Sequence, residues 1–148
     1  GNEIMRYLFP ENNEEIRNKI LSKICFVHSS VLFRKTSVVN IGGYCELADS
    51  RHIEDYDLWL RMGTVGKFGN LPLYSVKFTL REGSISSKNK KEQFKKNLNL
   101  IKIYKRKYPK YVTSVIKSYL RIFLYSFMAI IPFDFITKKI IKIYKEKW

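Results

Sequence analysis

The two halves of the chain differ sharply in charge, and this division limits how the polypeptide can fold. Residues 1–74 contain nine Lys/Arg and nine Asp/Glu, whereas residues 75–148 contain 19 basic and four acidic residues. The net charge of +15 therefore lies entirely in the second half. Such a division predicts a neutral module followed by a basic one whose partner carries phosphate, either on lipid or on nucleic acid.

The composition is that of a chain that folds around a core. Hydrophobic residues make up 45% of the sequence, and glycines and prolines number only seven and four, which excludes a disordered chain. The two cysteines, Cys25 and Cys45, are too few for a zinc site or a disulfide framework. We expect two buried thiols in a reducing compartment. The N-terminus lacks a charged segment followed by an apolar one, so no signal peptide is predicted.

The neutral half shows the periodicities of both helices and strands. A short amphipathic helix is expected over residues 11–23, capped by Asn12 or Asn13. The segments that follow are a strand or strand–turn–strand over 24–35, a glycine turn over 41–46, a helix from Glu54 to Met62 stopped by Gly63 and Gly66, strand periodicity over 67–81, and a polar linker over 82–91.

The basic half is predicted to be helical. Helical periodicity runs over 91–108 and 111–131, with Pro109 between them, and an amphipathic helix is expected over 134–148. The uncharged run at 122–133 has twelve residues, fewer than the roughly twenty that span a bilayer. A basic amphipathic helix that ends in Trp148 is typical of a segment that lies on an anionic membrane surface.

Five short motifs occur in a fixed order along residues 10–87. They are HSSVLFRK at 28–35, IGGY at 41–44, EDYDLWLRM at 54–62, LP at 71–72, and R followed by SIS at 81–86. Together they resemble the C-terminal half of a bacterial family 2 glycosyltransferase. The resemblance implies an α/β fold class, namely the C-terminal portion of a GT-A (nucleotide-diphospho-sugar transferase-like) fold, followed by basic amphipathic helices. The expected domains are an acceptor-binding, base-carrying half over 1–87 and a membrane-associated helical tail over 88–148.

The resemblance also implies roles for individual residues. Inverting sugar transfer is an in-line displacement in which the acceptor hydroxyl loses its proton as it attacks, so a carboxylate must lie within hydrogen-bond reach. The resemblance makes Asp55 this general base, and the positive end of the helix stabilises the ionised carboxylate. Glu54 would hold the acceptor or orient Asp55. The remaining roles implied are acceptor binding by Tyr56, Trp59, His28, Gly42 and Gly43, and donor-phosphate binding by Arg81.

The acids at the start of this helix also have a structural interpretation. Acidic residues are common in the first turn of any helix, so Glu54 and Asp55 alone would indicate a cap. Asp57 is expected to be a cap or the partner of Arg61 at the favourable i,i+4 spacing. The triplet from Asp55 to Asp57 is interpreted as part of the base motif, and not as a metal site.

The other candidates have structural alternatives as well. Trp59 can point into the core. A histidine such as His28 more often has a structural role than a ligand-binding one. The pair Gly42-Gly43 forms a turn by default, and the family suggests that its backbone also faces the acceptor.

The sequence departs from the family pattern in two respects. The roughly one hundred residues that carry the nucleotide-binding strands and the metal-binding acid triplet have no counterpart here, so a missing N-terminal half or a companion chain is expected to complete the site. Relatives also often place a histidine shortly after the arginine that matches Arg81, and this chain has none there. A divalent metal (Mg or Mn) is expected from the family, but its main ligands are not in this chain, and no metal ligand is assigned.

The expected function is that of an enzyme, an inverting, hexosyltransferase-like family 2 glycosyltransferase. It would transfer a sugar from a nucleotide-sugar donor to a saccharide or lipid-linked acceptor in the synthesis of cell-surface polysaccharide or lipopolysaccharide. We expect it in the cytoplasm, peripheral at the inner face of the cytoplasmic membrane, with its C-terminal helices on the anionic surface.

Two alternatives stay open. The chain could be a non-catalytic remnant or interaction module whose tail helices pack on the domain. It could also be a basic nucleic-acid-binding module, for which the interleaved lysines and tyrosines of 102–111 are suited. The apolar tail and the lack of a recognition motif argue against a nucleic-acid partner.

Overall fold

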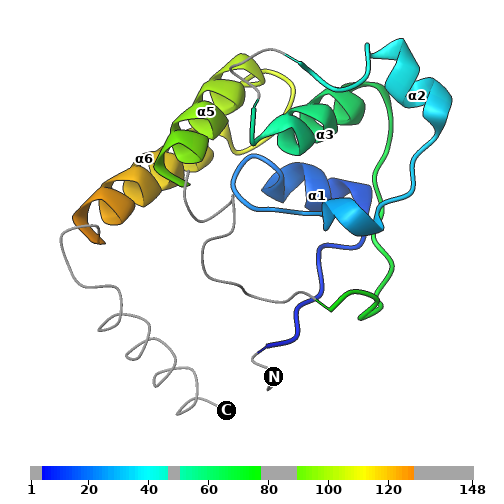
Figure 1. Cartoon of the computed structure of the whole chain (residues 1–148), viewed down its shortest axis with the longest axis horizontal. Helices are drawn as coiled ribbons and strands as arrows, with labels where there is room; N and C mark the ends of the chain where they lie inside the picture. The colour runs from blue at the N-terminus through cyan, green and yellow to red at the C-terminus, as the bar shows by residue number, and fades with distance from the viewer. Residues whose placement is uncertain (1–4, 47–50, 78–89, 129–148) are drawn as a thin grey trace.

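A computed structural model describes residues 5–46, 51–77 and 90–128 (Figure 1). Over these ranges the regular elements are helices, and no strand occurs. The elements are α1 (Asn13–Lys19), the 3-10 helix η1 (His28–Ser30), α2 (Lys35–Asn40), α3 (Glu54–Val65), α5 (Lys90–Ile103) and α6 (Tyr111–Met128).

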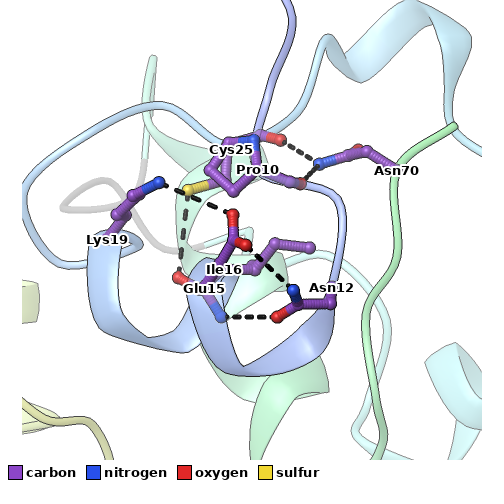
Figure 2. Close-up of polar contacts among 7 residues, drawn as sticks. All are labelled: Pro10, Asn12, Glu15, Ile16, Lys19, Cys25 and Asn70. Carbon is purple, nitrogen blue, oxygen red and sulfur yellow. Dashed lines mark hydrogen bonds and ion pairs between the residues drawn. The ribbon is translucent and has the colours of Figure 1, made fainter. Parts of the chain in front are cut away.

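Helix α1 begins at the cap that the sequence predicts. Asn12 is extended (φ −95°, ψ 161°), and its Oδ1 accepts a hydrogen bond from the Glu15 amide at 2.9 Å. Its Nδ2 donates to Glu15 Oε1, also at 2.9 Å, so the two side chains brace each other in the manner of a capping box (Figure 2). Asn13, the alternative cap, instead accepts from the Phe68 amide at 3.0 Å. The cap at Asn12 is thus confirmed.

The side chain of Asn70 joins two segments that are distant in sequence (Figure 2). Its Nδ2 donates to the carbonyl of Pro10 at 2.6 Å and to that of Cys25 at 3.0 Å. The backbone amide of Asn70 also donates to the carbonyl of Glu11 at 2.9 Å. One residue therefore holds the chain that enters α1 and the chain that leaves it.

Helix α3 is the most buried helix of the neutral half. Leu58 and Leu60 are fully buried, and they pack in one core with residues of α1 and of the basic half. The helix is longer than predicted: it ends at Val65 and not at Met62, so Gly63 lies inside it and Gly66 follows its last residue. A side chain at Gly63 would clash with the Tyr108 hydroxyl and the Phe68 ring. The buried core comprises Ile16, Ile20, Leu21, Cys25, Leu58, Trp59, Leu60, Ile101 and Tyr108.

The segments predicted as strands differ in the structure. Val27 and Val31 have extended backbone, but the residues between them form the short helix η1, and the last part of the 24–35 segment begins α2. Residues 67–77 contain no strand, and the rest of that predicted strand and the linker lie outside the described residues. An extended segment becomes a strand only when a neighbour pairs with it, and the described ranges supply no such neighbour. The α/β fold class stays a prediction.

Helices α5 and α6 lie side by side as a hairpin next to α1 and α3 (Figure 1). Arg17 of α1 fastens the connection between them: Nη2 donates to the Lys107 carbonyl at 2.7 Å, and Nη1 donates to the Gly63 carbonyl at 2.5 Å. The guanidinium also lies 4.8 Å from the centre of the Tyr108 ring, a cation–π contact. Tyr108 in turn donates to the Leu60 carbonyl at 2.7 Å. The basic half is therefore packed onto the neutral half.

The predicted helices of the basic half are found at 90–103 and 111–128. The predicted helix at 134–148 lies outside the described residues. Among the helices that the structure describes, none has the length and apolar content needed to cross a membrane.

We predict that replacing Asn70 with alanine destabilises the fold. The partly buried carbonyls of Pro10 and Cys25 lose their donor. Each lost hydrogen bond costs on the order of 1 kcal/mol, so the free energy of unfolding should fall by about 2 kcal/mol. Urea unfolding measures this loss. Asn99→Ala is the matched control, because Asn99 is exposed on α5 and alanine favours a helix. Equal stability of the two variants would contradict the prediction.

The buried thiol of Cys25 predicts a dependence of stability on pH. Burial raises the pKa of Cys25 from 9.0 to about 11, against the opposing effect of Lys19 and Lys23. Because the folded chain keeps the neutral thiol at a pH where the unfolded chain ionises, the stabilisation is complete below pH 9 and is lost between pH 9 and about 11. Urea midpoints should fall more steeply across this window in the wild type than in Cys25→Ala. Identical slopes would show that Cys25 does not cause the loss.

Candidate functional site

The three acids at the start of α3 have different environments. Ile53, at the N-cap position, has no side chain that can cap the helix. Asp55 supplies this interaction, because its Oδ1 accepts from the Tyr56 amide at 2.8 Å. Glu54 is exposed, Asp55 is half-buried, and Asp57 is only 7% exposed. The helix therefore presents Glu54 and Asp55 at its positive end and buries Asp57.

Asp57 and Arg61 form the predicted i,i+4 ion pair. Asp57 Oδ2 lies 2.8 Å from Arg61 Nε and 2.7 Å from Nη2. Nη1 of Arg61 donates to the carbonyls of Ile41 at 2.9 Å and of Gly43 at 2.6 Å. The ion pair is thus confirmed, and it connects α3 to the glycine turn after α2.

The glycine turn ends α2 in a Schellman motif. Gly42 donates to the Val39 carbonyl at 3.0 Å, and Gly43 donates to the Val38 carbonyl at 2.9 Å. Both glycines have left-handed backbone, with φ of 84° and 70°, which L side chains rarely adopt. A side chain at either position would meet no atom within 4 Å. The glycines are therefore required by the backbone conformation, and the space beside them is open.

An aromatic cluster lies where η1, the glycine turn and α3 meet. The Tyr44 hydroxyl is 3.1 Å from His28 Nε2, and the His28 ring centre is 5.5 Å from that of Trp59. Phe26 and Phe33 also pack against Trp59, at 5.3 and 6.2 Å between ring centres. The structure thus brings His28, the turn and Trp59 together, and the acceptor-binding roles of His28, Gly42 and Gly43 stay predictions. Tyr44 was not among the predicted site residues, although it is the last letter of IGGY.

A shallow hollow of about 210 Å³ opens beside the N-terminus of α3. It combines an aromatic ring, two carboxylates and a guanidinium, the types of group that bind the hydroxyls and the apolar face of a sugar. Glu54 is the one predicted site residue in its wall. The lining residues are Tyr44, Cys45, Glu46, Arg51 and Glu54.

Two of the predicted acceptor-binding residues are engaged in packing. The Tyr56 hydroxyl donates to the Ile20 carbonyl at 3.1 Å, and burial raises the pKa of this tyrosine. Trp59 is only 7% exposed and belongs to the core. Their acceptor-binding roles stay predictions, as does the donor-phosphate role of Arg81, which lies outside the described residues.

Metal-ligating residues do not gather in the described ranges. No group of three or more His, Cys, Asp or Glu side chains occurs there in positions that could hold a metal ion. The Mg or Mn ion expected from the resemblance therefore stays a prediction.

Curated bacterial proteins with similar sequences are named as glycosyltransferases. An "O-antigen biosynthesis glycosyltransferase WbnJ" of Escherichia coli is 41% identical over 63 residues, which are 42% of this chain and 23% of the relative. An "Uncharacterized glycosyltransferase" of Haemophilus influenzae is 31% identical over 104 residues (69% and 37%). An "Amylovoran biosynthesis glycosyltransferase AmsE" of Erwinia amylovora is 36% identical over 85 residues (57% and 30%).

This chain is similar to part of a bacterial glycosyltransferase. The similar stretch spans 23% to 37% of the length of these glycosyltransferases. No protein-family model matches the chain, and no solved structure matches it. The relation to glycosyltransferases is thus carried by sequence similarity over a part of each relative.

We predict that Arg61→Met strongly destabilises the chain. It leaves the largely buried Asp57 carboxylate without its partner, which costs about 3 kcal/mol, and it removes both hydrogen bonds to the glycine turn. Urea unfolding gives the loss, and faster amide exchange at Gly43 reports the loosened turn. Lys19→Met is the matched control: its ion pair with Glu15 is half exposed and is worth less than about 1 kcal/mol. Equal losses in both variants would disprove a special role of Arg61.

Proposed function

We propose that this chain is the acceptor-binding, base-carrying part of a glycosyltransferase and that Asp55 is its general base. The similarity to named glycosyltransferases supports the enzyme class. The finer parts of the proposal are the GT-A fold, the inverting family 2 mechanism, and the division into a catalytic half and a helical tail.

The different environments of the three acids are the observation that carries the assignment to Asp55. Asp57 is committed to Arg61, and Glu54 lines the hollow. Asp55 lies between them on a helix whose next turns are buried, and one of its two carboxylate oxygens is held by the Tyr56 amide. A carboxylate fixed through one oxygen can accept a proton on the other without losing its position.

The proposed step is a single displacement. The acceptor hydroxyl gives its proton to Asp55 while its oxygen forms a bond to the anomeric carbon of the donor sugar. The bond from that carbon to the diphosphate oxygen breaks, and the electron pair leaves with the nucleoside diphosphate. Glu54, Tyr44 and Arg51 would bind the acceptor sugar in the hollow so that one hydroxyl points at Asp55.

The substrates belong to the proposal as well. The donor would be a nucleotide sugar, and the acceptor a saccharide or a lipid-linked saccharide at the inner face of the cytoplasmic membrane. The names of two relatives mention O-antigen and amylovoran biosynthesis, which supports a surface polysaccharide as the product. The donor half, with any bound Mg or Mn, would come from residues outside this chain or from a companion chain, and no step above passes through a metal.

The test of the proposal is Asp55→Asn in this chain joined to a nucleotide-binding half. Release of nucleoside diphosphate is measured with a panel of nucleotide sugars and a lipid-linked acceptor extract. Removing a general base should lower kcat by roughly 10²- to 10⁴-fold. The melting temperature should stay near that of the wild type, because within the described residues Asp55 bonds only to the adjacent amide.

Two neighbouring variants serve as controls. Asp57→Asn should lower the melting temperature, because it breaks the pair with Arg61, and Glu54→Gln should mainly raise KM for the acceptor. A rate within a few-fold of the wild type for Asp55→Asn would show that Asp55 is not the base. Lack of transfer with every donor would count against the enzyme class itself.

A further inference from the structure

Helix α6 carries a continuous apolar stripe that faces solvent. At about 100° per residue, its members fall on one side of the helix, and each is at least 45% exposed. We call this stripe the outer face of α6. It consists of Val112, Ile116, Tyr119, Leu120, Phe123, Leu124 and Phe127.

The opposite side of α6 is packed against the rest of the protein and includes two buried serines. Ser114 is 1% exposed and Ser118 is 5% exposed. Their hydroxyls donate to the carbonyls of Lys110 and Ser114 in the preceding turn, both at 2.9 Å, so burying them leaves no hydroxyl unsatisfied. The small side chains let α6 pack closely against its neighbours. The helix thus buries two serines while large apolar side chains on its other side stay exposed, unlike a surface helix of a globular protein, which turns its apolar stripe toward the core.

Positive charges flank the outer face on both edges. On one edge, Lys102 of α5 donates to the Tyr119 hydroxyl at 3.3 Å and lies over the Tyr119 ring, 5.6 Å from its centre. On the other edge, Lys117 is exposed. The hairpin sequence from 90 to 128 contains 11 Lys/Arg and one Glu. An apolar strip with a lysine at each edge, on a hairpin of high positive charge, is suited to an anionic lipid surface.

We propose that the outer face of α6 lies flat on an anionic membrane, with Phe123 and Phe127 in the lipid interface and Lys102 and Lys117 at the phosphates. None of the described helices is long and apolar enough to cross a bilayer, so the contact lies in the interface plane. Aromatic side chains are favoured at that depth. This membrane contact does not depend on whether the chain transfers sugar. If it does, the contact identifies the surface by which the enzyme lies on the membrane.

Charge argues against two other occupants of the outer face. A second copy would bring the same excess of lysine and arginine to the interface, and like charges repel at this range. Residues 129–148 contain five lysines and two acids, so they are also positive. An anionic lipid surface is the partner whose charge is complementary.

The experiment measures binding of the whole chain to sedimenting vesicles. Vesicles with equal parts phosphatidylcholine and phosphatidylglycerol are compared with vesicles of phosphatidylcholine alone. We expect binding to the anionic vesicles, weakened by raising the salt from about 0.1 M to 1 M. Phe123→Ser combined with Phe127→Ser should lower the partition coefficient by roughly tenfold or more, because two aromatic side chains no longer enter the interface.

A matched control and a tail variant locate the contact. Leu32 and Leu71 are 100% and 78% exposed elsewhere on the surface, and replacing both with serine should leave binding within about twofold. Replacing Lys138, Lys139 and Lys142 with glutamine tests whether the tail, and not the outer face of α6, makes the contact; on the proposal this variant keeps its binding to anionic vesicles. Circular dichroism verifies that each variant remains folded.

Four results would overturn the proposal. The first is wild-type affinity of the Phe123/Phe127 variant, and the second is loss of binding in the tail variant alone. The third is equal binding to neutral and anionic vesicles. The fourth is a dimer, seen by sedimentation equilibrium without lipid, that becomes monomeric in the Phe123/Phe127 variant, because the outer face would then be a contact between two copies.

Discussion

The described structure depends on the burial of α3 between α1 and the α5–α6 hairpin. Tyr108 reaches the Leu60 carbonyl from the hairpin, and Arg17 reaches the Gly63 carbonyl from α1 while it covers the Tyr108 ring. Polar groups of three segments thus meet at one end of α3, and apolar side chains close around its middle. Because a helix buried in this way cannot rotate or slide, its first turn is fixed, and so are the acids that the first turn carries.

The pair of Asp57 and Arg61 also fixes the position of the glycine turn relative to α3. A guanidinium has donors on three nitrogens. Arg61 donates from Nε to the Asp57 carboxylate and from Nη1 to two backbone carbonyls. The turn that leads to Tyr44 is therefore positioned by the same helix that presents Asp55. A site assembled from a turn and a helix terminus needs such a connection, because hydrogen bonds within the turn do not fix its place relative to the helix.

Sequence alone predicted the features that depend on near neighbours. The Asn12 cap, the left-handed turn at Gly42 and the Asp57–Arg61 pair each rest on residues three to four positions apart or on a single backbone preference. Features that depend on distant residues were missed or mistaken. Gly63 is predicted as a helix stop, although it lies inside α3, where a side chain would clash with the Phe68 ring and with Tyr108, which is distant in sequence. The segment at 24–35 is predicted as a strand or a strand–turn–strand, although strand pairing is a property of two segments and not of one.

The position of Tyr44 and the orientation of α6 also depend on residues that are distant in sequence, so near neighbours do not predict them. Nothing local links Tyr44 to His28, 16 residues earlier, and their contact appears only once the turn and η1 are folded. In α6 the apolar period marks one face of a helix but does not state what covers it. The buried serines show which face of α6 is exposed, because a helix that packs through Ser114 and Ser118 must turn Phe123 outward. A large apolar face that a folded domain leaves in water marks an interaction site, and the anionic lipid surface that we propose as its partner would cover this face.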